Sequence, residues 1–347
     1  MGPIVFFVKK KFYKKLDNFL NKFRRYKENQ FSKLYCSNYS AVEKIHVCLY
    51  QQGHDNQFTR FFTSSDAREH SFILVAQPAQ ADVVIFLNSI DDKVLRPNQA
   101  AILFFHEPFA YVHLYQSELN EKLFPKANLE VVSHLPTSSS FIKDADGIKH
   151  HRSIPYVHFH HGATYDQLNS INEAKRTKLI CSIATGLKGI PGYHNRRQFL
   201  ENFSAKNPNL DLFGKFSEAS ASISAYRGQC ISKWKVVSQY KYSLTIENSV
   251  EDYYISEKIF DALICGSMPI YYGSDKIFEV LPKEWFYYLP SLDASEIDKL
   301  NAFIATDAYK IVSQNRAEIC KFVYEKFGFF NALERLLAKQ PLPVITK

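Results

Sequence analysis

Residues 243–273, SLTIENSVEDYYISEKIFDALICGSMPIYYG, gather carboxylates, an amide and an ammonium group around one short turn. Glu247 and Asn248 follow a strand-like run, while Glu257 and Lys258 open an amphipathic segment that resembles a helix. A glutamate in the first turn of a helix complements the helix dipole. A lysine there is unfavourable unless an anion joins it, and a bound phosphate would supply that anion.

With a phosphate at this helix N-terminus, the neighbouring polar side chains would contact the rest of a nucleotide. Glu247 or Glu257 could accept a hydrogen bond from a ribose hydroxyl, and Asn248 could make an amide contact. Tyr254 could provide a ring to pack on. The spacing alone is also compatible with a solvated turn, so both interpretations remain open on the residue pattern.

The first half of the chain alternates apolar runs with connecting segments, which is typical of an α/β protein. Several runs are apolar on both faces, as buried parallel strands are. The gaps at 51–71 and 108–125 have room for helices. The predicted strands are 42–50, 72–77, 82–88, 101–107 and 129–135.

A second α/β series begins at residue 178, after an irregular stretch that contains one more extended piece, IPYVHFH. Its predicted strands are 178–185, 210–214, 242–248 and 268–273, and its predicted helices are 196–206, 232–240, 256–265, 293–305 and 307–338. Ser256 is a favourable N-cap for the third of these helices, and Gly266 suits the position after its end.

These two series predict two Rossmann-like domains that face a cleft, with ligands at the carboxyl ends of the strands. The expected organisation is a basic amphipathic segment at 1–40, a first domain at 41–158, a linker at 159–176, a second domain at 177–330 and a tail at 331–347.

The chain is basic, with 43 Lys and Arg against 35 Asp and Glu and a formal charge of +8, which favours an anionic partner. Residues 9–27 contain nine basic residues and one acidic residue, with Leu16, Phe19, Leu20 and Phe23 on one helical face. Such a helix could lie on an anionic membrane surface, or pack on the protein with its basic face in solvent.

Other classes of protein are disfavoured. The apolar run GPIVFFV is too short to cross a bilayer, which takes about 20 residues, and no signal-peptide layout surrounds it. The six cysteines are far apart and form no C-x-x-C pair, which fits a reducing cytosol and encodes no zinc site of cysteines. The sequence has no RNA-binding or helix-turn-helix signature, so we expect no nucleic-acid partner.

The segment IENS…YISEKIFDALICGSMPIYYG resembles the donor-site signature of the α1,3/α1,4-fucosyltransferases, glycosyltransferase family 10. Ile246 stands where that family usually has an aromatic residue. Two further segments fit the family: ATGLKGIPGYHNRRQFL, with Arg196 as the better match and Arg197 as the alternative near the start of a helix, and ILFFHEPFAY, with Glu107 after a strand. The resemblance implies a GT-B fold, with an N-terminal acceptor domain and a C-terminal domain that binds GDP-fucose.

The resemblance also implies an inverting transfer, in which an acceptor hydroxyl attacks C1 of the sugar from the face opposite the leaving GDP. Glu107 would be the general base, and Arg196 and Lys258 would stabilise the charge that grows on the diphosphate. Glu257 would accept hydrogen bonds from sugar hydroxyls and favour oxocarbenium character at C1. The candidate catalytic residues are Glu107 and Glu257, and the candidate donor-binding residues are Arg196, Asn248, Tyr254, Glu257 and Lys258.

Simpler interpretations exist for several of these residues. Glu107, which precedes a proline, could merely end a strand, and Arg196 could be a solvated helix residue. His158 and His160 share one face of an extended stretch, but no carboxylate or cysteine completes a metal site nearby. Because lysine and arginine can take the place of a metal at a diphosphate, we expect no obligatory metal or other cofactor.

The expected partners are GDP-fucose and an oligosaccharide acceptor, such as a GlcNAc of a surface polysaccharide or lipopolysaccharide, linked α1,3 or α1,4. The alternatives are a GT-B transferase for another GDP- or UDP-sugar and a non-catalytic basic protein that binds polyanions or membranes. The latter leaves Glu107 and Glu257 unexplained. We expect a cytoplasmic enzyme of bacterial type, peripheral on the inner membrane face through residues 9–27, and the oligomeric state stays open.

Overall fold

A computed structural model of the 347-residue chain describes residues 44–50, 71–109, 128–135, 148–154, 171, 176–185, 191–215, 223–230 and 232–342. Several predicted features lie outside these residues: the basic helix at 9–27, most of the predicted helices at 51–71 and 108–125, and the extended stretch that contains His158 and His160. No described helix is long and apolar enough to cross a bilayer.

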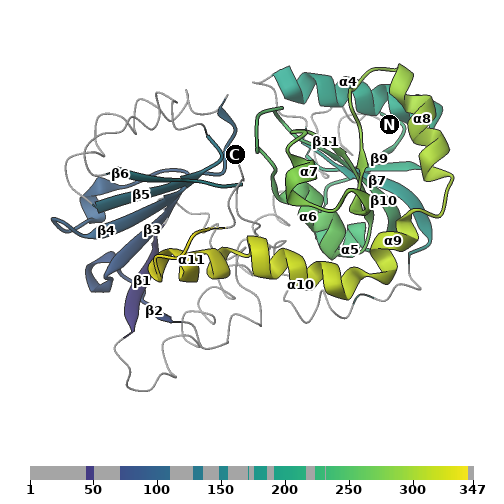
Figure 1. Cartoon of the computed structure of the whole chain (residues 1–347). Helices are drawn as coiled ribbons and strands as arrows, with labels where there is room; N and C mark the ends of the chain where they lie inside the picture. Colours follow the sequence, from purple (N-terminus) through teal and green to yellow (C-terminus); the bar gives the residue numbers. More distant parts are fainter. Residues whose placement is uncertain are drawn as a thin grey trace, which may run out of the picture.

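Six parallel strands form the first sheet, in the order β2-β1-β3-β4-β5-β6 (Figure 1). Alternate residues of β3 lie in different clusters, Ile85 and Leu87 in one and Val84 and Phe86 in the other, so the sheet is buried on both faces. This burial confirms the predicted parallel strands. The strands are β1 (Ile45–Tyr50), β2 (Phe72–Leu74), β3 (Val83–Leu87), β4 (Ala100–Phe104), β5 (Asn128–Ser133) and β6 (Ile148–Arg152).

The strand β6 was not predicted, because its residues, IKHHR, are mostly polar. It pairs with β5 at the edge of the sheet, where a strand can carry polar side chains. His150 Nε2 lies 2.9 Å from Ser133 Oγ, and His151 Nε2 lies 2.5 Å from Glu130 Oε2. These two histidines therefore contact side chains of the neighbouring strand.

The second sheet also has six parallel strands, in the order β12-β11-β10-β7-β8-β9. Its strands are β7 (Lys178–Ile183), β8 (Leu210–Phe213), β9 (Tyr226–Gly228), β10 (Tyr240–Ile246), β11 (Met268–Tyr272) and β12 (Tyr287–Tyr288). Its helices are α4 (Pro191–Lys206), α5 (Lys233–Val237), α6 (Glu257–Ile264), α7 (Ile277–Val280), α8 (Ser295–Ile304), α9 (Tyr309–Gln314) and α10 (Arg316–Phe327).

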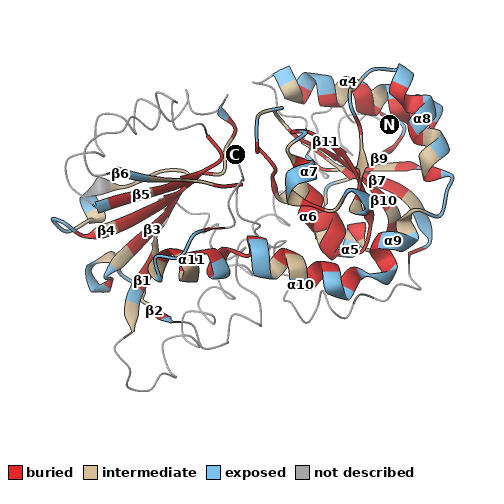
Figure 2. Cartoon of the chain, viewed as in Figure 1, coloured by how far each residue is buried: buried red, intermediate tan, exposed pale blue. Residues whose placement is uncertain are grey.

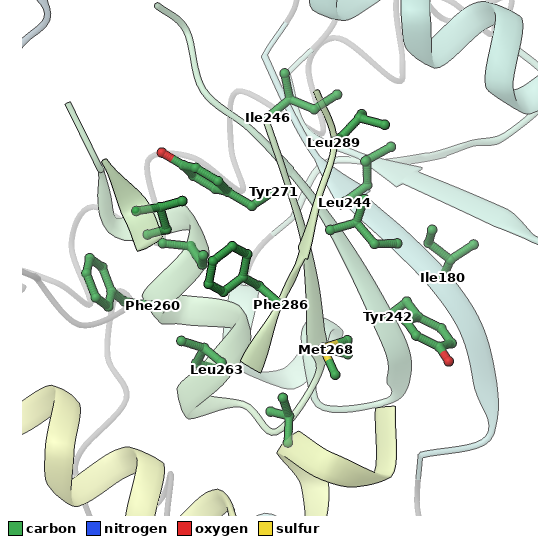
Figure 3. Close-up of a cluster of buried hydrophobic side chains, with 14 of the residues drawn as sticks. Ile180, Tyr242, Leu244, Ile246, Phe260, Leu263, Met268, Tyr271, Phe286 and Leu289 are labelled. Atoms are coloured by element: carbon green, nitrogen blue, oxygen red, sulfur yellow. The ribbon is translucent and has the colours of Figure 1, made fainter. Parts of the chain in front are cut away.

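The core of the second domain forms where β10 meets α6. Tyr242, Leu244 and Ile246 of β10 point into the same buried cluster as Phe260 and Leu263 of α6 (Figure 3). The predicted boundaries of α6 are confirmed. The Ser256 side chain accepts a hydrogen bond from the Lys258 backbone N–H, and Gly266, just past the end of α6, has φ +74°, a conformation that glycine adopts without strain.

The last helix, α11 (Phe329–Leu337), returns to the first domain. Figure 1 shows α10 beside the second sheet and α11 continuing along the first sheet. The Phe329 ring lies 4.9 Å from the ring of Phe104, and the Phe330 ring stacks on Phe72 at 6.1 Å. The buried side of α11 is therefore part of the core of the first domain (Figure 2). Residues 331–347 were expected to form a tail, and the return of α11 to the first domain was not predicted.

Leu333 tests how much the first domain depends on α11. The Leu333 side chain is fully buried in the cluster that includes Phe104 and Val132. We predict that Leu333→Ala lowers the free energy of unfolding by about 2–5 kcal/mol, because the substitution leaves a cavity in a packed core. Urea denaturation measures the loss, with exposed Gln340→Ala as the control. Equal stability of the two variants would show that α11 does not contribute to this core.

Candidate active site

The turn between β10 and α6 is built around one buried carboxylate. The Glu247 side chain has no exposed surface, and its position is fixed by the backbone, because Glu247 N donates to Tyr272 O at 2.9 Å. Its carboxylate accepts hydrogen bonds from Ser256 N at 2.8 Å, from Ser256 Oγ at 2.7 Å and from Lys258 Nζ at 2.9 Å. Glu247 therefore ties the end of the strand to the first turn of the helix.

Lys258 is held in this network with a side chain that is only 17% exposed. Its ammonium also donates to Ser256 Oγ at 2.8 Å. Burial by itself would lower the pKa of Lys258, but the carboxylates of Glu247 and Glu257 outweigh it, so that the pKa is raised and the side chain stays charged. Lys258 therefore does not depend on a bound phosphate for a counter-charge, as its place in the helix had suggested, because Glu247 already provides one.

Arg196 is the second cation of the site, and it is buried rather than solvated, with 3% of its surface exposed. Its Nη1 donates to Asn248 Oδ1 at 2.6 Å and its Nη2 donates to Thr185 O at 3.1 Å. The two bonds join α4 to the residues that follow β10 and β7. A Cβ on Gly192 would lie 1.8 Å from Asn248 O. Only glycine therefore allows the backbone at the start of α4 to come this close to the backbone of Asn248.

Arg196 and Lys258 lie close enough to interact electrostatically, because the positive charge of Arg196 counteracts part of the rise in the pKa of Lys258. Both follow the carboxyl ends of strands in the second sheet, where a parallel α/β domain binds its ligands. Two cations held at this end of the sheet by neutral and acidic partners could bind the charges of a diphosphate.

The residues after β4 form the opposing side of the site. Asn88, which follows β3 with φ +62°, accepts a hydrogen bond from His106 N at 2.8 Å through Oδ1. Its Nδ2 lies 3.5 Å from Glu107 Oε1. Asn88 therefore orients the half-buried Glu107 carboxylate, and asparagine is one of the few residues that tolerate this backbone conformation.

Tyr254 belongs to the turn between β10 and α6 and is 3% exposed. Its ring centroid is 5.1 Å from that of His134, which follows β5. Burial raises the pKa of Tyr254 well above its ordinary value, and the negative charges of Glu247 and Glu107 add to the shift. The ring contact with His134 shows that the carboxyl end of β5, in the first domain, faces the β10–α6 turn.

Glu251, which is not among the predicted site residues, bridges the two domains. Its Oε2 accepts a hydrogen bond from Phe109 N at 2.8 Å. The same oxygen lies 3.1 Å from His134 Nε2. The Ser249 hydroxyl donates to Oε1 at 2.6 Å. An acidic residue in a polar loop gives no sequence signal for such a contact, since its partners are more than a hundred residues away.

Glu257, the remaining predicted catalytic residue, begins α6 with its side chain 20% exposed. Lys233 Nζ lies 3.4 Å from its Oε1. Burial lowers the pKa of His106 to about 3, and the Glu257 carboxylate opposes that shift, so Glu257 also lies near the first domain. The structure thus gathers all the predicted site residues, Glu107, Arg196, Asn248, Tyr254, Glu257 and Lys258, around one turn.

Comparisons with known proteins agree with this geometry. Residues 173–326 match the model of glycosyltransferase family 10 (fucosyltransferase) C-term. A fucosyltransferase-like protein of Arabidopsis thaliana is 28% identical over 118 residues, which cover 31% of this chain and 23% of that protein. The chain therefore matches less than a quarter of the length of this curated relative.

Solved structures show a similar architecture. A DNA-modifying β-glucosyltransferase is 12% identical, with a TM-score of 0.56 over 85% of this chain and 100% of its own. An α1,3-fucosyltransferase solved with GDP-fucose is 16% identical, with a TM-score of 0.43 over 91% of this chain and 96% of its own. The first of these likenesses concerns the fold alone, and the second is too loose to support an argument.

The two parallel α/β domains give the chain the GT-B-type fold of nucleotide-sugar glycosyltransferases, as the sequence predicted. The domain at residues 173–326, which contains Arg196 and Lys258, is similar to the C-terminal domain of glycosyltransferase family 10, the fucosyltransferases.

The buried pair Glu247–Lys258 yields a stability test. We predict that Lys258→Met lowers the free energy of unfolding by about 3–5 kcal/mol, because it leaves the Glu247 charge buried without its cation. The double variant Glu247→Gln/Lys258→Met should recover part of that loss in urea denaturation. Lys276→Met, which removes one partner of the surface pair Lys276–Glu279, should change little. Equal losses in the Lys258 single and double variants would contradict the pairing.

His106 yields a pH dependence. Its pKa is about 3 in the folded protein and 6.5 ordinarily, so the unfolded chain binds more protons between these pH values. The stabilisation from neutral His106 is complete above pH 6.5 and is lost as the pH falls toward 3. We therefore predict that His106→Asn makes the loss of unfolding free energy between pH 6.5 and 4 shallower than in the wild type. Parallel curves for the two proteins would show that His106 does not titrate in this way.

Proposed function

We propose that the protein is an inverting fucosyltransferase, which transfers L-fucose from GDP-β-L-fucose to a hydroxyl of a glycan acceptor in α1,3 or α1,4 linkage. The observation that carries the proposal is the match of residues 173–326 to the fucosyltransferase family, with Arg196 and Lys258 together at the ligand-binding end of that domain.

Arg196 and Lys258 are suited to stabilise the leaving GDP. Each is already fixed by hydrogen bonds, Arg196 to Asn248 and Lys258 to Glu247, so neither has to be ordered when charge develops on the β-phosphate. Such preorganised charge is the largest contribution to catalysis in many enzymes. Because the two side chains supply the positive charge themselves, we propose that no metal is obligatory.

Glu107 is suited to act as the general base. In a single displacement, the acceptor oxygen attacks C1 while the bond from C1 to the GDP oxygen breaks, and the bonding electrons leave with GDP. The proton of the acceptor hydroxyl passes to a carboxylate on the opposite side of the sugar. Glu107 belongs to the first domain, and its charge contributes to the raised pKa of Tyr254 in the β10–α6 turn. Lys258 belongs to the second domain and donates a hydrogen bond to Glu247 at the start of the same turn.

The other site residues have supporting roles in this proposal. Glu257 would accept hydrogen bonds from hydroxyls of the donor and favour positive charge at C1. Asn248 would position the nucleotide while it holds Arg196. Tyr254, whose ring is buried against His134, would act by holding the turn in place. The acceptor would be a GlcNAc of a surface polysaccharide or lipopolysaccharide, reached by a cytoplasmic enzyme that binds the inner membrane face through residues 9–27.

Glu107→Gln tests the base. We predict that this variant loses about 10²–10⁴-fold in kcat, because the amide cannot accept the proton, while GDP binds with unchanged affinity. Rates come from GDP release with an N-acetyllactosamine acceptor, and affinities from calorimetry. The matched control is Asp82→Asn, since Asp82 precedes β3 at the amino end of the same sheet and bonds to His46 N. Unchanged turnover in Glu107→Gln would remove Glu107 as the base.

A donor panel separates fucose transfer from the use of another nucleotide sugar. The wild-type protein is incubated with GDP-fucose, GDP-mannose, UDP-glucose and UDP-GlcNAc together with an array of acceptors, and the linkage of any product is determined by NMR. Transfer from GDP-fucose alone supports the proposal. Transfer from one of the other donors, with none from GDP-fucose, would overturn it.

A further inference from the structure

Lys233 is a half-buried cation to which neither the sequence pattern nor the proposed mechanism gives a role. It begins α5, which packs against α6. Its Nζ lies 3.2 Å from Asp261 Oδ2 and 3.4 Å from Glu257 Oε1, so one ammonium group joins two carboxylates of the same helix. The side chains of Lys233, Glu257 and Asp261 are 29%, 20% and 6% exposed.

The two carboxylates need this cation. Glu257 and Asp261 stand one helical turn apart on the same face of α6, where like charges repel. Burial by itself would lower the pKa of Lys233, but Asp261 and Glu257 outweigh it and raise the pKa, so Lys233 remains an ammonium ion between them. Lys233 thereby neutralises the charge of Asp261, the more buried of the two carboxylates.

Glu257 has other positive charge within its reach. It contributes to the raised pKa of Lys258 and opposes the lowered pKa of His106, so it lies between its own helix and the first domain. Without Lys233, its carboxylate would be repelled by Asp261 and attracted by Lys258, which we assign to the diphosphate. Lys233 holds one oxygen of Glu257 from the side of α5 and prevents that rearrangement.

We propose that Lys233 is a positioning residue, which fixes the Glu257 carboxylate toward the sugar of the bound donor. The inference rests on the proposed function, since it specifies how a residue of the same site is oriented. A purely structural role makes a different prediction: if Lys233 only neutralised buried Asp261, the fold would need it but the chemistry would not.

The test removes Lys233 and Asp261 together, which leaves no buried charge without a partner. In Lys233→Met/Asp261→Asn we expect a wild-type melting temperature but a kcat/KM for GDP-fucose that is lower by about 10²-fold, since misplacing a reacting group costs about that much. Asp261→Asn alone should keep near-normal activity, because the Lys233–Glu257 contact remains. Lys233→Arg should restore most of the activity, because the guanidinium can still reach Glu257.

A double-mutant cycle with Glu257→Gln assigns the effect to Glu257. When Glu257 is already replaced, the further change Lys233→Met/Asp261→Asn should reduce kcat/KM by less than about threefold, because the residue that it positions is gone. Full activity of Lys233→Met/Asp261→Asn, or an undiminished loss in the Glu257→Gln background, would overturn the positioning role. A wild-type protein that transfers no fucose in the donor panel would overturn the proposed function, and this inference with it.

Discussion

The buried carboxylate of Glu247 is the constraint on which the rest of the site depends. A charge without exposed surface is tolerated only when donors surround it, and Glu247 obtains them from Ser256 and Lys258. Those bonds bring the N-terminus of α6 back against the end of β10 and hold the ammonium of Lys258 in place. The same network stabilises the fold and fixes a cation where the second domain can bind an anion.

The turn that Glu247 closes is also where the two domains meet. Glu251 reaches Phe109 N and His134, and Tyr254 packs on the His134 ring. The Arg152 guanidinium, at the end of β6, lies over the ring of Tyr253, 5.1 Å from its centroid. A shift of this turn would therefore move Lys258 and Glu257 relative to Glu107. This coupling gives a physical reason for building donor-binding groups and domain contacts into one short loop.

Much of the fold could be predicted from sequence, because continuous apolar runs such as VVIFL in β3 indicate strands buried on both faces. Ser256 and Gly266 likewise marked the ends of α6. The edge strand β6 could not be recognised, because its residues are mostly polar. The return of α11 could not be predicted either, because an apolar helix face indicates a helix but does not show which sheet it packs against. At the site, residue types predicted the cations and carboxylates, but the link of Lys258 to Glu247 and the bridge from Glu251 depend on tertiary contacts that spacing does not encode.

The most direct measurement of the donor site is a crystal structure of the protein with GDP. The diphosphate is expected between the Arg196 guanidinium and the Lys258 ammonium, with a phosphate oxygen within about 4 Å of each nitrogen group. Asn248 and Glu257 should lie beside the nucleotide in the same crystals. A nucleotide bound elsewhere on the chain, or a diphosphate that neither cation reaches, would contradict the assignment.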